Sequence, residues 1–167
     1  MYYFYFDASA LVKRYTEEIG SDKIDFLFQN VPLNRLMCLA IGVAEVFSIC
    51  VRKRNGGRIT RHHFEQTVGY LDSEVINTES DFETIPVQNA LIWESISLMD
   101  PHSINSVDAI LLCSALNIAA NLRDQNNELV LIASDQRLLR AAQTEGLLCF
   151  NPETDSLQML MNWVATQ

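Results

Sequence analysis

Four acidic residues each lie beside or within a different apolar segment of this 167-residue chain. They are Asp7, Glu45, Asp108 and Asp135. Carboxylates gathered at one point repel one another and are costly to desolvate unless a cation is held among them. Mg²⁺ and Mn²⁺ prefer oxygen ligands and keep several waters for substrate phosphates. If the fold brings the four acids together, we therefore expect a divalent-metal site suited to phosphodiester hydrolysis.

Each of these acids also has a purely structural interpretation. Asp7, Asp108 and Asp135 stand where helices are expected to start, and an acid there gains about 0.3–1 kcal/mol from the helix dipole. Glu45 is harder to explain in this way, because its neighbours within one helical turn include neither Lys nor Arg. An unpaired, partly buried carboxylate costs several kcal/mol or stays protonated. Capping is therefore the strongest rival interpretation for Asp135, and the weakest for Glu45.

The hydrophobic pattern predicts the elements that must position these acids. Predicted strands cover residues 2–6, 82–87, 129–133 and 147–150. Predicted helices cover about residues 9–18, 24–28, 41–53, 90–99, 107–122 and 138–142, a segment capped by Thr60, and a stretch from about residue 156. Asp100-Pro101-His102 is expected to break one helix and Ser106 to cap the next.

The alternation of strands and helices predicts an α/β fold with a central parallel sheet of about four to five strands and helices on both faces. Ligands in such folds bind outside the carboxyl ends of the strands. Asp7 and Asp135 each directly follow an apolar strand, so both are expected at that edge.

Length and composition indicate one globular domain, which we place at residues 1–150, with residues 151–167 as a C-terminal helix packed on it. The longest apolar run, residues 36–44, is too short to span a membrane, and no signal peptide is evident. Four cysteines in apolar segments, without C-x-x-C spacing, are typical of core thiols. We therefore expect a cytoplasmic protein without a membrane partner.

The charge balance argues against a general nucleic-acid coat, because 21 acidic residues against 12 basic residues give a net charge of −9. The basic residues cluster, however, at positions 52, 53, 54, 58 and 61. This cluster is either an ordinary solvated face or a patch for phosphate groups.

The sequence lacks the residues that other kinds of hydrolase would need. The sequence shows no Ser-His-Asp set, no reactive-cysteine motif and no Gly-rich phosphate loop, and its histidines have no zinc-ligand spacing. A haloacid-dehalogenase-type phosphatase would need a second Asp two residues after Asp7, where Ser9 stands. Two alternatives to a nuclease stay open: another Mg²⁺-dependent phosphohydrolase, and a non-catalytic RNA- or protein-binding module.

Four motifs, in this order, resemble those of PIN-domain ribonucleases, and most of all VapC-type toxins of type II toxin–antitoxin systems. They are DASALVKRY at residues 7–15, VAEV at 43–46, SVDAILL at 106–112 and ASDQRLL at 133–139. The resemblance implies an endoribonuclease dependent on Mg²⁺ or Mn²⁺, in which the four acids hold the metal or position its water. It also implies a homodimer, and a cognate antitoxin protein with a segment lying across the acidic cleft.

The same resemblance implies roles for residues near the acids. Ser9 and Ser134 match small hydroxyl positions that support the carboxylates. The residues expected to contact the RNA substrate are Lys13, Arg14, Arg52 and Arg54.

Overall fold

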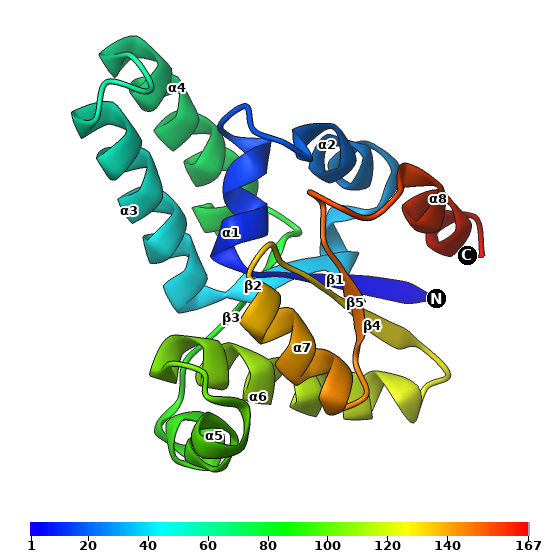
Figure 1. Cartoon of the computed structure of the whole chain (residues 1–167). Helices are drawn as coiled ribbons and strands as arrows, with labels where there is room; N and C mark the ends of the chain where they lie inside the picture. The colour runs from blue at the N-terminus through cyan, green and yellow to red at the C-terminus, as the bar shows by residue number, and fades with distance from the viewer. Residues whose placement is uncertain (167) are drawn as a thin grey trace.

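The computed structural model describes residues 1–166 and contains a five-stranded, fully parallel sheet with the order β3-β2-β1-β4-β5 (Figure 1). The strands are β1 (Tyr2–Phe6), β2 (Leu36–Leu39), β3 (Glu83–Ile85), β4 (Glu128–Ile132) and β5 (Leu148–Phe150). The predicted α/β fold is thereby confirmed, and β1 and β4 pair in the middle of the sheet.

Helices cover both faces of the sheet (Figure 1). Successive side chains of a strand point to opposite faces, so each strand contributes to two separate cores. Phe4 and Phe6 belong to one hydrophobic core and Tyr5 to the other. The first core includes residues of α1 (Ala8–Leu11), η1 (Val12–Arg14), α2 (Ser21–Asn30), α3 (Ala40–Asn55), α4 (Arg61–Leu71), η3 (Asp72–Ile76) and α8 (Leu157–Ala165). The second lies under α5 (Asn89–His102), α6 (Ser106–Arg123) and α7 (Gln136–Thr144). A short 3₁₀ turn, η2 (Leu33–Arg35), leads into β2.

Several predicted boundaries differ from the observed ones. The helix expected at residues 9–18 is a single α turn that tightens into the 3₁₀ turn η1. The hydrophobic pattern did not predict β2. This buried strand and the start of α3 form one continuous apolar run with no polar residue between them. α5 continues through Pro101 to His102, since a proline in the last turn removes only one backbone hydrogen bond.

The start of α6 also lies one residue earlier than expected. Ser106 is its first residue rather than its cap, and the Asn105 side-chain oxygen accepts hydrogen bonds from the backbone N–H groups of Val107 and Asp108 at 2.9 and 3.0 Å. The predicted cap of α4 is confirmed, because the Thr60 side chain accepts a hydrogen bond from the backbone N–H of His63.

The C-terminal helix α8 packs against the first core. Trp163 lies 6.0 Å from the Tyr2 ring and 6.2 Å from the Phe150 ring, centroid to centroid. Gln167, the last residue of the expected C-terminal segment, lies outside the described residues. Over residues 1–166 no single helix is long and apolar enough to cross a membrane; only α5 and α6 pass on length and composition as a pair, bent by 111°.

Candidate active site

The four acids line a single cavity of about 320 Å³ at the carboxyl edge of the sheet. Asp7 and Asp135 come from the ends of β1 and β4, whereas Glu45 and Asp108 come from α3 and α6, on opposite faces of the sheet. Ala8, Ser9, Ser48, Ile49 and Arg52 complete the lining. Residues separated by more than a hundred positions thus line the same cavity.

Asp7 is the most deeply buried of the four acids. It is only 8% exposed, and its backbone N–H donates to the carbonyl oxygen of Ile132 at 2.9 Å. Its Oδ2 accepts hydrogen bonds from the backbone N–H of Ser9, at 2.9 Å, and from the Ser9 hydroxyl. Burial raises the pKa of Asp7 above its ordinary value, and the Ser9 hydrogen bonds oppose this rise without cancelling it.

Ser9 also connects two of the acidic segments. Its Oγ accepts a hydrogen bond from the backbone N–H of Ser134 at 2.9 Å, and Asp135 follows directly. The predicted supporting position of Ser9 thereby has a geometric basis. Ser134 contributes to this link through its backbone amide.

Glu45 lies in the second turn of α3, partly buried. Across residues 1–166 no hydrogen bond engages its carboxylate. Burial raises the pKa of Glu45, the negative charges of Asp7 and Asp108 raise it further, and Arg52 opposes the shift. These groups place Glu45 in the acidic cavity, as its lack of helical counter-charges suggested.

Asp108 lies in the first turn of α6, and its Oδ2 accepts a hydrogen bond from the Asn105 side-chain amide at 2.7 Å. Burial, followed by the charges of Asp7 and Asp135, raises the pKa of Asp108 to about 6, and Arg137 opposes this rise. This carboxyl therefore carries a strong electrostatic penalty when it ionises in the metal-free protein.

Asp135 is both a helix cap and a lining residue of the cavity. Its Oδ1 accepts hydrogen bonds from the backbone N–H groups of Arg137 and Leu138 at 2.7 and 3.2 Å. No hydrogen bond within residues 1–166 engages Oδ2. The capping interpretation is therefore right for Asp135, and it leaves one oxygen of the same carboxylate for the cavity.

The structure separates the expected RNA-contacting cations. Only Arg52 lines the cavity, where its guanidinium donates to Ser48 Oγ at 2.9 Å. Lys13 is 3% exposed and ion-paired, so it is not accessible to a phosphate group, contrary to expectation. Arg14 is paired with two carboxylates, and the Arg54 guanidinium lies 4.5 Å from the centre of the Phe64 ring.

Three residues near the acids were not singled out from the sequence. Ser48 is one helical turn after Glu45, Asn105 bonds to Asp108, and Arg137 lies close enough to lower the Asp108 pKa. The spacing of Ser48 from Glu45 is a usable signal, because residues three apart share a helix face. The contribution of Arg137 depends on the approach of α7 to α6, which no local pattern reports.

The donor set fits a hard divalent cation chemically. All four acids provide oxygen, and the pKa values of three of them are raised, chiefly by burial and further by neighbouring carboxylates. Among residues 1–166, however, no three His, Cys, Asp or Glu side chains are already grouped closely enough to hold an ion. The residues that would hold Mg²⁺ or Mn²⁺ are Asp7, Glu45, Asp108 and Asp135.

The fold and the site define a parallel α/β protein with acidic residues at the carboxyl edge of its sheet, where folds of this class bind their ligands. The PIN-domain family model matches residues 4–143, so the chain belongs to the PIN-domain family. Members of this family are generally nucleases.

Solved structures support the same fold. The chain resembles PAE2754 from Pyrobaculum aerophilum with a TM-score of 0.57 and 17% identity, over 99% of this chain and 96% of that one. It resembles FitAcB from Neisseria gonorrhoeae with a TM-score of 0.58 and 14% identity, over 91% of this chain and 99% of that one. No curated protein sequence gives a significant match.

Proposed function

We propose that this chain is an endoribonuclease that depends on Mg²⁺ or Mn²⁺. The observation that carries the proposal is the convergence of four acids, from two strand ends and two helices, on one cavity of a PIN-domain fold. When bound, a divalent ion activates water and stabilises the negative charge that develops on the phosphate. Asp7, Glu45, Asp108 and Asp135 would hold it.

The residues of the chain provide the rest of the site. Ser9 fixes the Asp7 carboxylate through two hydrogen bonds and ties it to the Asp135 turn. Arg52, held by Ser48 at the cavity wall, places a guanidinium where it can pair with a non-bridging phosphate oxygen of the RNA. The overall charge of −9 makes this local cation important for substrate binding.

The proposal extends to biological role, on the strength of the four VapC-like motifs. We infer a toxin that forms a homodimer and is neutralised by a cognate antitoxin, with a nuclease domain at residues 1–150 and the following residues as its C-terminal helix. An upstream reading frame encoding a DNA-binding half and an Arg-bearing tail would support this role. Expression of the wild-type chain, but not of its Asp108→Asn variant, is then expected to arrest growth.

One observation favours a second candidate, a non-catalytic RNA- or protein-binding module. Among the described residues, no three acids are already grouped as a metal site. Such a module would bind RNA without cutting it, whether or not divalent ions were present.

The decisive experiment measures cleavage of a labelled single-stranded RNA by the purified chain with Mg²⁺, Mn²⁺ or EDTA. We expect Asp7→Asn and Asp108→Asn each to lower the rate at least about 100-fold, because charge stabilisation at the phosphate is lost. Glu79→Gln, which neutralises an exposed acid elsewhere, is the matched control. Circular dichroism confirms that each variant is folded.

Each alternative gives a different result in the same assay. Undiminished cleavage by the Asp7→Asn, Asp108→Asn double variant would remove the site assignment. Hydrolysis of p-nitrophenyl phosphate without RNA cleavage would indicate another phosphohydrolase. RNA binding without cleavage would indicate the non-catalytic module.

A further inference from the structure

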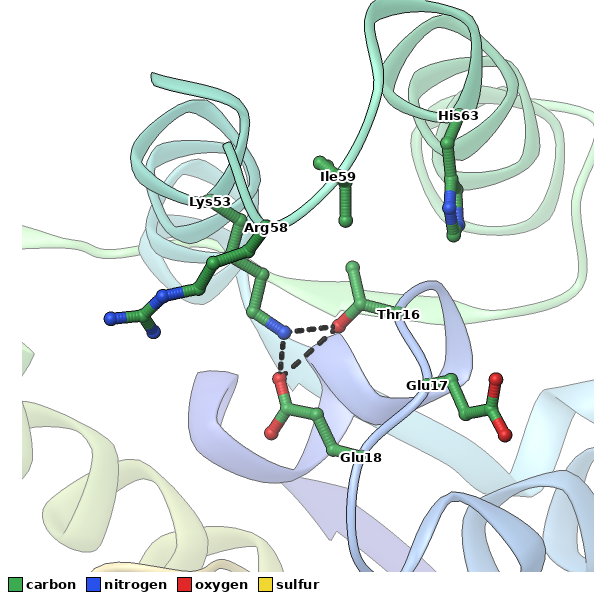
Figure 2. A pocket seen from close by; sticks show the side chains of 7 residues that line it. All are labelled: Thr16, Glu17, Glu18, Lys53, Arg58, Ile59 and His63. Carbon is green, nitrogen blue, oxygen red and sulfur yellow. Dashed lines mark hydrogen bonds and ion pairs between the residues drawn. The ribbon is translucent and has the colours of Figure 1, made fainter. Parts of the chain in front are cut away.

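A cluster of four charged side chains lies beyond the acidic cavity, and none of its members lines that cavity. Lys13 Nζ contacts Glu18 Oε2 at 3.1 Å and Glu153 Oε1 at 2.8 Å. Lys53 Nζ pairs with Glu18 Oε1 and donates to Thr16 Oγ1 at 2.8 Å, as Figure 2 shows. We call Lys13, Glu18, Lys53 and Glu153 the charge cluster.

Lys13 is the buried centre of this cluster. Its side chain is 2% exposed, compared with 28% for Glu18 and 42% for Glu153. Although burial would raise the pKa of Glu18, hydrogen bonds from Lys53 and Lys13 bring it below its ordinary value. The Lys13 hydrogen bond likewise lowers the pKa of Glu153. Without Lys13, Glu18 would keep its ion pair with Lys53, but Glu153 would face the Glu18 carboxylate without the ion pair it makes to Lys13.

The charge cluster joins the segments that carry three of the four acids. Lys13 lies in η1, which directly continues the helix that Asp7 caps. Lys53 lies on α3, eight residues or about two turns beyond Glu45. Glu153 lies in the loop after β5. Phe150, the last residue of β5, accepts a hydrogen bond from the backbone N–H of Ala133, two residues before Asp135.

Two further contacts hold the loop after β5 in the same place. Lys23 Nζ donates to the Pro152 carbonyl oxygen at 2.8 Å. A Cβ atom at Gly20 would lie 2.3 Å from that same oxygen, so the two backbones are in close contact. The loop therefore sits against η1 and α2 in one defined position, and Lys13 pairs with Glu153, one of its two acids.

We propose that Lys13 is a positioning residue of the acidic site. Its buried ammonium pairs with both Glu18 and Glu153. Because Glu18 also pairs with Lys53, this cluster holds α3 against the segments that carry Asp7 and Asp135. Lys13 acts by setting the relative positions of the metal-binding carboxylates, and it does not touch RNA. The inference rests on the proposed function, because it assigns a role toward that function's metal site.

The test compares Lys13→Met, Lys13→Arg and Glu153→Gln with the wild-type chain. Three quantities are measured: the Kd for Mn²⁺ by calorimetric titration, and kcat and KM for RNA cleavage. In Lys13→Met we expect Mn²⁺ affinity and kcat to fall about tenfold each, as found when residues that orient metal ligands are lost, with KM for RNA within about twofold of wild type. Lys13→Arg should recover most of both losses.

Glu153→Gln keeps the proposal testable if Lys13→Met does not fold, because Glu153 is partly exposed and its replacement is isosteric. It should weaken Mn²⁺ binding in the same direction and add little to Lys13→Met in the double variant. Arg123→Met is the matched control. This variant breaks a different ion pair, between Arg123 and Glu128, at the start of β4 and away from the acidic cavity. It should leave the Kd for Mn²⁺, kcat and KM unchanged.

The outcomes separate this inference from the proposed function. A Lys13→Met variant with unchanged Mn²⁺ affinity and kcat but a raised KM would show an RNA contact and overturn the positioning role. A wild-type chain that binds Mn²⁺ but cleaves no RNA would defeat the proposed function, while the Mn²⁺ affinities would still decide the role of Lys13. Equal Mn²⁺ affinities in all the folded variants would overturn that role.

Discussion

The pKa of the Asp108 carboxyl is raised to about 6, first by burial and then by the negative charges of Asp7 and Asp135. Asp7 and Glu45 are shifted in the same direction, also chiefly by burial. At the scale of single residues, ionising the carboxyls of this site is therefore unfavourable, first because they are buried and then because they repel one another.

This cost of ionisation predicts how stability depends on pH. An acid with a raised folded pKa stabilises the fold below its unfolded pKa, and that contribution is lost as pH rises through the folded value. For Asp108 the loss runs from about pH 4 to about pH 6. In EDTA at pH 7.5, we expect Asp108→Asn to raise the free energy of unfolding by about 1–2 kcal/mol, allowing for solvent screening.

Urea denaturation from pH 4 to pH 8 checks this prediction. The Asp108→Asn variant should show a shallower decline than wild type, with some slope left from Asp7 and Glu45. Parallel curves for the two proteins would contradict it. Glu79→Gln serves as the control for loss of one exposed negative charge.

Asp135 allows its two roles to be separated. Asp135→Asn keeps an oxygen for the backbone N–H groups of Arg137 and Leu138 and removes only the charge. Asp135→Ala removes both, and loss of a cap costs about 0.5–2 kcal/mol. We expect only the Ala variant to lose stability and both variants to lose RNA cleavage; full activity in Asp135→Asn would leave capping as the sole role.

At the scale of elements, the site is assembled in two different ways. β1 and β4 pair in parallel up to Phe6 and Ile132, so Asp7, which directly follows β1, must lie near the turn that carries Asp135, three residues beyond Ile132. Asp7 and Asp135 were predictable on this ground from the strand patterns alone. Glu45 and Asp108 depend instead on how α3 and α6 cross the sheet edge from opposite faces, and helix patterns do not encode that angle.

The junction between α2 and the loop after β5 gives an element-scale prediction. Gly20 has φ +88° and contacts the Pro152 carbonyl, so Gly20→Ala should cost about 3 kcal/mol or more, from strain and overlap together. Gly57 has φ +70° with no atom near its Cβ position, so Gly57→Ala should cost only the strain, about 1–2 kcal/mol. Thermal denaturation of both variants makes the comparison, and equal losses would contradict the close contact.

At the scale of the whole molecule, the net charge is −9, and the cavity gathers four of the acidic residues with one lining cation, Arg52. At the proposed metal site, ion binding and folding would be coupled, since an ion favours the state in which the carboxylates line one cavity. The coupling is long-range, because the four acids belong to segments from both ends of the chain.

This coupling predicts that divalent ions stabilise the protein. A ligand at 100 times its Kd adds about 2.7 kcal/mol to the free energy of unfolding when it binds only the folded state. We expect the melting temperature to rise with Mn²⁺ or Mg²⁺ in wild type and to be nearly constant in the Asp7→Asn, Asp108→Asn double variant. A wild-type melting temperature that does not respond to millimolar ion would count against a shared metal site.

The sequence alone predicted the α/β class and the position of Asp7 and Asp135 at the carboxyl edge of the sheet, because hydrophobic periodicity and strand ends are local signals. It did not separate β2 from the apolar run before α3, and it misplaced Lys13. The motif around Lys13 matches a basic position near the acids, but solvent exposure and ion pairing depend on segments far away in the chain. The position of Arg52 in the cavity lining depends on the packing of α3 against the sheet edge. Lys13 is buried between Glu18 and Glu153 because only the packed fold brings residue 153 against residue 13.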